Sequence, residues 1–202
     1  MSRARFRKAL QSRDAADPAV APLVEAHAAR LEQLDDRWPL DPEAQARMLR
    51  AAQALYGLDA VTIGAGGQLA ARVEIARDVC RRLRPVLGER AAIALVLPGG
   101  DAEAAADLIR ALGAEEPEAF FLLGDGPIDP TLETLAEFFG AALLPLGAGA
   151  PPGLISLAPH TFIRAEAPAH GWLITTTTEI DAAADPHALR SAIERLRSSG
   201  ER

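Results

Sequence analysis

Short, wholly apolar segments alternate with amphipathic helical segments along most of the chain, and this alternation constrains the fold more than any other feature. The clearest apolar segment is 91–97 (AAIALVL), which leads through the turn 98–101 into a helical stretch that ends at Gly113. A strand without polar positions is typical of a parallel sheet that is covered on both faces. Repeated strand–helix units favour parallel strands with right-handed crossovers. The sequence therefore predicts an α/β fold.

The number of candidate strands points to a barrel. Eight apolar segments qualify as strands: 19–24, 60–63, 91–97, 119–123, 142–146, 154–157, 162–164 and 172–176. A (β/α)₈ barrel has eight strands but typically takes about 250 residues, and this chain has 202. The deficit falls in the second half, where only loops join the candidate strands. We expect one domain over residues 1–202 with a shortened or incomplete TIM-type barrel, either closed but stripped of helices or open and covered by another chain.

Helix starts are marked by a repeated dipeptide. Asp41-Pro42, Asp129-Pro130 and Asp185-Pro186 each place a side-chain acceptor at the N-cap and a proline at the first helical position, where its missing N–H costs nothing. Residues 2–12 are also expected to form a short basic helix. These signals predict where the helices between the strands begin.

Charge and cysteine content exclude several classes of protein. The net charge of −7 disfavours nucleic-acid binding, and the basic run from Arg3 to Arg13 is interpreted as the solvated face of a first helix. Cys80 is the only cysteine, which excludes an internal disulfide and a thiolate zinc cluster, and its helical spacing predicts a buried core thiol. Because no apolar run reaches about 18 residues and no signal peptide opens the chain, we expect a cytoplasmic protein without membrane contact.

Several stretches resemble the uroporphyrinogen-decarboxylase family and its relatives, the cobamide-dependent methyltransferases. Residues 5–10 with 17–20 are similar to the family's first helix and first strand, and 41–64 (DPEAQARMLRAAQALYGLDAVTIG) to the next helix and strand. Residues 91–100 resemble the third strand and its turn, and 171–180 (GWLITTTTEI) the last strand. The resemblance implies a barrel with its site at the carboxyl ends of the strands.

The residues that carry the family's chemistry are mostly replaced. In the decarboxylases an arginine-rich segment after the first strand holds the substrate carboxylates; here Arg30 matches its second arginine and Ala26 stands at the first. The family's aspartate after the second strand is replaced near Gly64. Thr178 stands where decarboxylases have a histidine and the methyltransferases a zinc-binding cysteine. Because the sequence also contains no His-x-Cys pair, the thiolate zinc chemistry of the methyltransferases is excluded.

The candidate site is drawn from the predicted strand ends. Its catalytic candidates are Glu25, His27 and Arg30, and its ligand-binding candidates are Asp125, His160, Thr178 and Glu179. His27 and His160 with Glu25 or Asp125 have the composition of a two-histidine, one-carboxylate site, but nothing in their spacing demands a metal, and none is predicted. The same histidines suit general acid–base work beside a carboxylate or simple loop and capping roles.

Two functions from different classes follow. The first is a divergent small-molecule binder or enzyme, either a decarboxylase-like lyase or a methyltransferase-related protein, with no cofactor specified. The second is a non-catalytic interaction subunit, a degenerate barrel whose exposed strand surface is covered by a partner or a second copy. Such a cover is expected because apolar surface left in water costs about 25 cal/mol per Å². Either way we expect a homo-oligomer or a partner subunit.

Overall fold

The strands and helices alternate along the chain as the sequence predicts. A computed structural model describes residues 2–14, 16–64, 69–124, 128–147, 149–166 and 171–198. Its strands are β1 (Ala19–Val20), β2 (Ala60–Ile63), β3 (Ala92–Leu97), β4 (Ala119–Leu122), β5 (Ala142–Pro145), β6 (Leu154–Leu157) and β7 (Leu173–Thr176). Its α-helices are α1 (Ser2–Ser12), α2 (Glu25–Leu31), α3 (Pro42–Tyr56), α4 (Val73–Leu87), α5 (Ala102–Leu112), α6 (Pro130–Phe138), α7 (Pro159–Arg164) and α8 (Pro186–Ser198).

All strand pairs are parallel and form two sheets. The larger sheet has the order β2-β3-β4-β5, and the smaller has the order β1-β7-β6. The sheets adjoin between β1 and β2, where the Asp59 N–H donates to the Val20 carbonyl at 3.1 Å. On the other flank the Ser156 hydroxyl donates to the Leu146 carbonyl at 3.1 Å, but within the described residues no backbone ladder joins β5 to β6. The α/β class is confirmed, while the strands in the described part of the chain do not form a closed ring.

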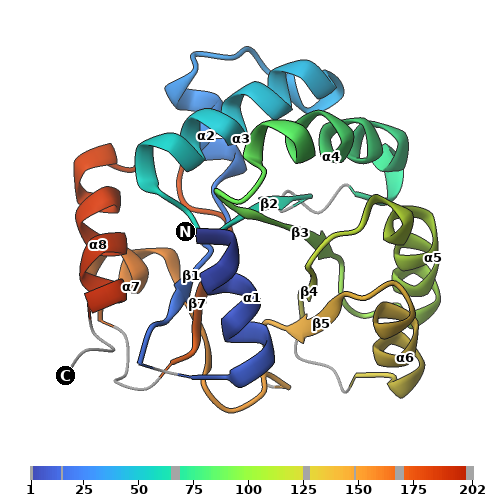
Figure 1. Ribbon diagram of the computed structural model, residues 1–202. Helices are drawn as coiled ribbons and strands as arrows, with labels where there is room; N and C mark the ends of the chain where they lie inside the picture. The colour runs from blue at the N-terminus through green and yellow to red at the C-terminus, as the bar shows by residue number, and fades with distance from the viewer. Residues whose placement is uncertain are drawn as a thin grey trace.

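The two faces of the strands differ in the size of their side chains. The helices α2 to α8 lie around the strands (Figure 1). On the face of the strands that packs against these helices, alternate positions carry large side chains such as Ile93, Leu95 and Phe120. The opposite positions form a second cluster that is rich in alanine, including Ala60, Ala92 and Ala94. Small side chains on one face allow strands from both sheets to share one narrow interior.

Helix α1 covers the amino-terminal ends of the strands. Its residues Phe6 and Ala9 belong to the alanine-rich cluster and are 0% and 2% exposed. Its arginines bind carboxylates that stand just before β2 and β4: Arg5 contacts Asp59 at 2.9 Å, and Arg3 contacts Glu118 at 2.6 Å. The interpretation of the basic run as only a solvated face was therefore wrong, because three of its arginines, Arg3, Arg5 and Arg7, contact buried carboxylates.

Two strand predictions in the sequence were wrong. Residues 162–164 lie in helix α7, in which Pro159 occupies the first turn and Phe162 is fully buried. A helix therefore connects β6 and β7, where only a loop was expected, and seven strands are seen among the described residues instead of eight. The first strand is also shorter than predicted: β1 contains two residues, and α2 begins at Glu25.

The predicted helix starts are confirmed. The Asp41 carboxylate accepts from the Glu43 and Ala44 N–H groups at 2.9 and 3.1 Å, and Asp129 caps α6 through Thr131. Asp185 accepts from the His187 N–H at the start of α8. None of the helices in the described part of the chain is long and apolar enough to span a bilayer.

Candidate functional site

Three strand ends meet at the edge of the sheets opposite α1 and form a pocket. Glu25 follows β1, Gly64 follows β2, and Glu179 follows β7, and all three line this pocket. The remaining lining residues are Ile63 at the end of β2 and residues from the segments before and along α3 and α4: Trp38, Pro39, Gln45, Leu69, Arg72, Ile75 and Ala76. Parallel strands place their carboxyl ends along one edge, which is where ligands bind in α/β proteins.

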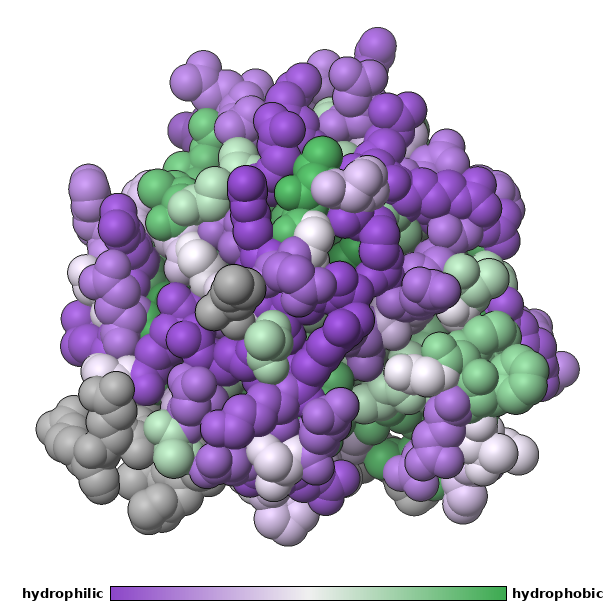
Figure 2. Space-filling view, in the orientation of Figure 1, coloured by the Kyte–Doolittle hydropathy of each residue, from purple (hydrophilic) through white to green (hydrophobic). Residues whose placement is uncertain are grey.

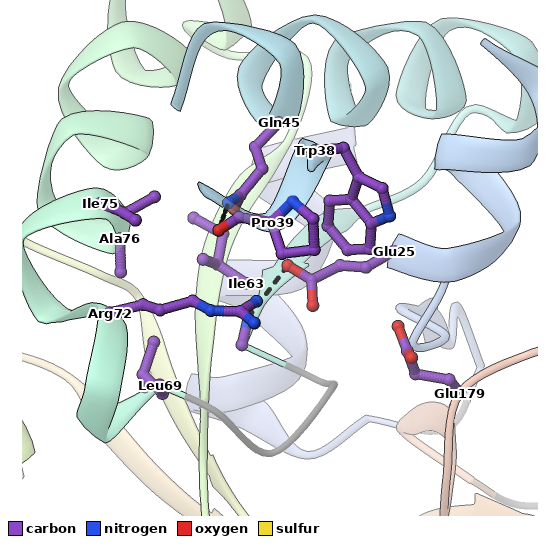
Figure 3. A pocket seen from close by; sticks show the side chains of 11 residues that line it. Glu25, Trp38, Pro39, Gln45, Ile63, Leu69, Arg72, Ile75, Ala76 and Glu179 are labelled. Atoms are coloured by element: carbon purple, nitrogen blue, oxygen red, sulfur yellow. Dashed lines mark hydrogen bonds between the residues drawn. The ribbon is translucent and has the colours of Figure 1, made fainter. Parts of the chain in front are cut away.

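Glu25 is the most buried charged group of the pocket, at 3% exposure. Its Oε1 accepts a hydrogen bond from the Gly64 N–H at 3.0 Å, which ties the start of α2 to the end of β2. Arg72 extends across the pocket toward this carboxylate (Figure 3). A buried carboxylate needs hydrogen bonds and an opposite charge to offset its desolvation, and the pocket supplies both to Glu25.

Glu179 approaches the pocket from the side opposite Arg72 (Figure 3). Its Oε1 accepts a hydrogen bond from the Ala26 N–H at 3.1 Å, so this side chain caps the first turn of α2. Burial raises the pKa of Glu179 above its ordinary value, and the N–H groups of Ala26 and Glu25 oppose that shift. A carboxyl group of this kind can exchange a proton closer to neutral pH than an exposed glutamate can.

The other walls of the pocket are aromatic and aliphatic. Trp38 is half-buried and lies beside Glu25, while Ile63 and Leu69 are almost fully buried. Gln45 is held in place because its Nε2 donates to the Pro39 carbonyl at 2.8 Å. The pocket has a volume of about 180 Å³. A cavity of about 150 Å³ accommodates benzene, so a pocket of this size fits one ring.

His27 is placed away from this pocket. It is 1% exposed, and its Nε2 lies 2.7 Å from the Tyr56 hydroxyl on α3. Its Nδ1 makes no hydrogen bond within the described residues. Burial lowers the pKa of His27, and the nearby backbone of Asp181 and Ala182 together with the Asp181 charge opposes that shift only in part. This environment keeps the imidazole neutral and inaccessible.

The structure brings together two of the seven predicted site residues, Glu25 and Glu179. Arg30 on α2, His160 on α7 and Thr178 are all exposed and do not line the pocket. Asp125 lies outside the described residues. Among the predicted site residues that the structure describes, the cluster at one rim therefore reduces to the two glutamates.

Sequence reasoning missed Arg72 and Trp38, each for an identifiable reason. Arg72 lies outside the α-helices: α4 begins at Val73, and Arg72 ends a short 3₁₀ turn before it. Its position after the second strand is the signal that could have found it. Trp38 could not be assigned to the pocket, because nothing in the sequence shows that its segment folds back over the strand ends.

No metal or thiol chemistry is indicated by the geometry. Within the described part of the chain, no three histidine, cysteine, aspartate or glutamate side chains form a group that could hold a metal ion. Cys80 is 1% exposed, and burial raises the pKa of its thiol to about 12. The prediction of a buried core thiol is confirmed, and Cys80 is no nucleophile at neutral pH. In comparisons of the sequence with known proteins, no family model and no curated protein matches the chain.

Proposed function

We propose that this chain is a shortened (β/α) barrel related to the uroporphyrinogen-decarboxylase family, and that it binds a small molecule at the carboxyl ends of β1, β2 and β7. The observation that carries the proposal is the pocket in which Glu25, Arg72 and Glu179 meet over an apolar wall. Mostly apolar concave sites with a few placed polar groups are typical ligand sites. The barrel is supported by the parallel strands, the interior that both sheets share, and α1 at the opposite end.

The size of the pocket limits the ligand. A volume of about 180 Å³ holds one ring, whereas a porphyrinogen carries four pyrrole rings and eight carboxylates. Those carboxylates require several arginines for charge-assisted pairing, and Arg72, the one arginine of the lining, points toward Glu25. We therefore assign a ligand much smaller than the substrate of the family's decarboxylases.

If the protein is an enzyme, its chemistry is a proton transfer to or from Glu179. This side chain combines a raised pKa with a place at the pocket wall, which are the properties of a general acid or base. A lyase that releases carbon dioxide needs such an acid to protonate the carbanion that remains. His27 is too deeply buried for that role.

The proposal can be tested with benzyl alcohol, a neutral one-ring probe. We expect saturable shifts of the methyl resonances of Ile63 and Ile75 and of the Trp38 indole N–H in NMR titrations, with Ile193 in α8 as the internal control. Trp38→Ala should abolish the shifts at Ile63 and Ile75, while Arg30→Ala and His160→Ala should leave them unchanged. Equal small shifts over the whole molecule, or a loss of binding on mutating Arg30 or His160, would argue against this pocket.

A second candidate function, an interaction subunit, is favoured by apolar surface away from the pocket. Phe138 at the end of α6 is 80% exposed. It borders a groove between α5 and α6, lined also by Ala106, Leu132 and Leu135, and this region of the surface shows apolar colouring at the right of Figure 2. An exposed aromatic side chain beside an apolar groove is typical of a contact surface.

A further inference from the structure

We propose that the pocket selects a small organic cation, an amine carried on a single ring or a body of similar size, and that Glu179 is the group that binds the ammonium. This inference rests on the proposed function, because it assigns the chemical class of the ligand to the same pocket. It follows from the balance of charges, from the hydrogen-bonding groups that are already engaged, and from the aromatic wall.

The two carboxylates of the pocket differ in their charge partners. Glu25 faces Arg72 and accepts the Gly64 N–H. Glu179 accepts backbone N–H groups at the start of α2, and it forms no salt bridge with any side chain in the described ranges. One positive and two negative side chains leave the pocket with an excess of negative charge at Glu179. A cation bound there supplies the missing charge.

The donors and acceptors of the lining point to the same ligand class. Three donors of the wall are already directed at protein groups: the Gly64 N–H binds Glu25, the Gln45 Nε2 binds the Pro39 carbonyl, and Arg72 points toward Glu25. Glu179 accepts the Ala26 N–H through Oε1, and because a carboxylate has about four lone-pair sites, acceptor capacity remains at this side chain. A site that offers acceptors binds ligands that bring donors, and an ammonium group brings three.

The apolar wall gives the cation a second favourable contact. Trp38 lies beside the carboxylates (Figure 3), and a cation over an indole face is attracted by the ring quadrupole. Ile63, Leu69 and Ile75 can cover the hydrocarbon part of the ligand. In a partly desolvated site these interactions are stronger than at an open surface.

Three probes of nearly equal size separate charge from shape: benzylamine, benzyl alcohol and benzoate, which are cationic, neutral and anionic at pH 7. In titrations monitored at the Ile63 and Ile75 methyl groups, the full chain should bind benzylamine at least about tenfold more tightly than benzyl alcohol, a factor that corresponds to about 1.4 kcal/mol. Benzoate should bind most weakly. Glu179→Gln should reduce the affinity for benzylamine to that for benzyl alcohol and leave the latter unchanged.

The variants are chosen so that folding does not confuse the result. Glutamine keeps an oxygen that can accept the Ala26 N–H, so the cap of α2 survives in Glu179→Gln. Glu137→Gln removes an exposed carboxylate on α6, outside this pocket, and should leave all three affinities unchanged. Tighter binding of benzoate than of benzylamine, lost in Arg72→Gln, would overturn the inference and leave the proposed function standing. If none of the probes shifts the pocket methyl groups, the proposed function fails as well.

Discussion

Gly64 illustrates how one residue limits what this pocket can contain. Its φ of +92° lies in the region that favours glycine, and a Cβ atom there would come within 2.9 Å of Leu69 Cδ1 and 3.1 Å of the Val96 carbonyl oxygen. The resemblance places the decarboxylases' aspartate near this position. The space is filled by Leu69 and the backbone, so Gly64 has no room for such a side chain.

Gly64→Ala should therefore be more destabilising than the matched change Gly100→Ala. Gly100 has a φ of +90° with no atom within 4 Å of an added Cβ, so its replacement shows backbone strain alone, about 1–3 kcal/mol. Crowding at Gly64 should add about 1–3 kcal/mol and disturb the hydrogen bond to Glu25. Urea unfolding measures the loss of unfolding free energy in both variants. Equal losses would show that the Leu69 side chain moves aside without an energetic penalty.

His27 makes stability depend on pH near neutrality. Its pKa in the folded protein is lowered by burial, so below the ordinary value of about 6.5 the unfolded chain binds a proton that the folded protein resists. The contribution of His27 to the free energy of unfolding is therefore complete above pH 6.5 and is lost as the pH falls toward its lowered pKa.

The free energy of unfolding should decrease between pH 7.5 and about 5.5, a range above the ordinary pKa values of carboxylates. His27→Gln, which cannot be protonated, should flatten this dependence, whereas His160→Gln, at an exposed position, should not. Urea titrations at three pH values measure the slope. A slope that persists in His27→Gln would assign the effect to another group.

At the scale of elements, α1 is fixed by buried ion pairs. Glu118, just before β4, is 7% exposed and contacts Arg3, Arg7 and Arg84 at 2.6, 3.0 and 3.4 Å, while its Oε2 accepts the Ile93 N–H. Burial would raise the pKa of Glu118, but the Ile93 N–H and the arginines outweigh it, so the pKa is lowered. One carboxylate therefore connects α1, α4, β3 and β4.

Glu118→Ala should cost about 3–5 kcal/mol in unfolding free energy, the typical loss when one partner of a buried ion pair is removed. The control is Glu89→Ala, because Glu89 contacts the same Arg3 at 3.3 Å but is 62% exposed, and exposed pairs contribute about 0–1 kcal/mol. Chemical denaturation measures both losses. Similar small losses would mean that the apolar contacts of Phe6, not the ion pairs, hold α1.

Elements with a local chemical signal could be predicted, and those without one could not. Asp41, Asp129 and Asp185 cap their helices as expected, since a cap depends on residues two or three positions away. The segment 162–164 (Phe-Ile-Arg) is too short to show a helical period, so a strand was predicted where α7 forms. The 3₁₀ turn that places Arg72 in the pocket also has no signature in the sequence.

At the scale of the whole molecule, much of the strand order follows from the sequence. Consecutive parallel units predict that β2, β3, β4 and β5 are neighbours, and they are. A closed barrel also requires its first and last strands to pair, as β1 and β7 do. Glu25 and Glu179 could be predicted as rim residues, whereas the segment of Trp38, which completes their pocket, has no signal in the sequence.

The surface around α6 should determine whether the chain self-associates. If the groove beside Phe138 is a contact between copies, Phe138→Ser should shift a dimer toward monomer in sedimentation velocity at low micromolar concentration. Leu40→Ser, which removes another exposed apolar side chain (64% exposed), should not. A wild-type chain that is monomeric under these conditions would count against the interaction subunit.

The hydrogen bonds between β1 and β7 also determine when the protein can fold. The Thr175 hydroxyl binds the Ala21 carbonyl across 154 positions of the chain, and Asp59 joins Arg5 to Arg197. During translation, β1 leaves the ribosome long before its partner β7 has been made. The strands β2 to β5 can assemble earlier together with α1, whose arginines contact Asp59 and Glu118. Strand β1 should therefore lack its partner until β7 emerges, and in that interval chaperones have access to it.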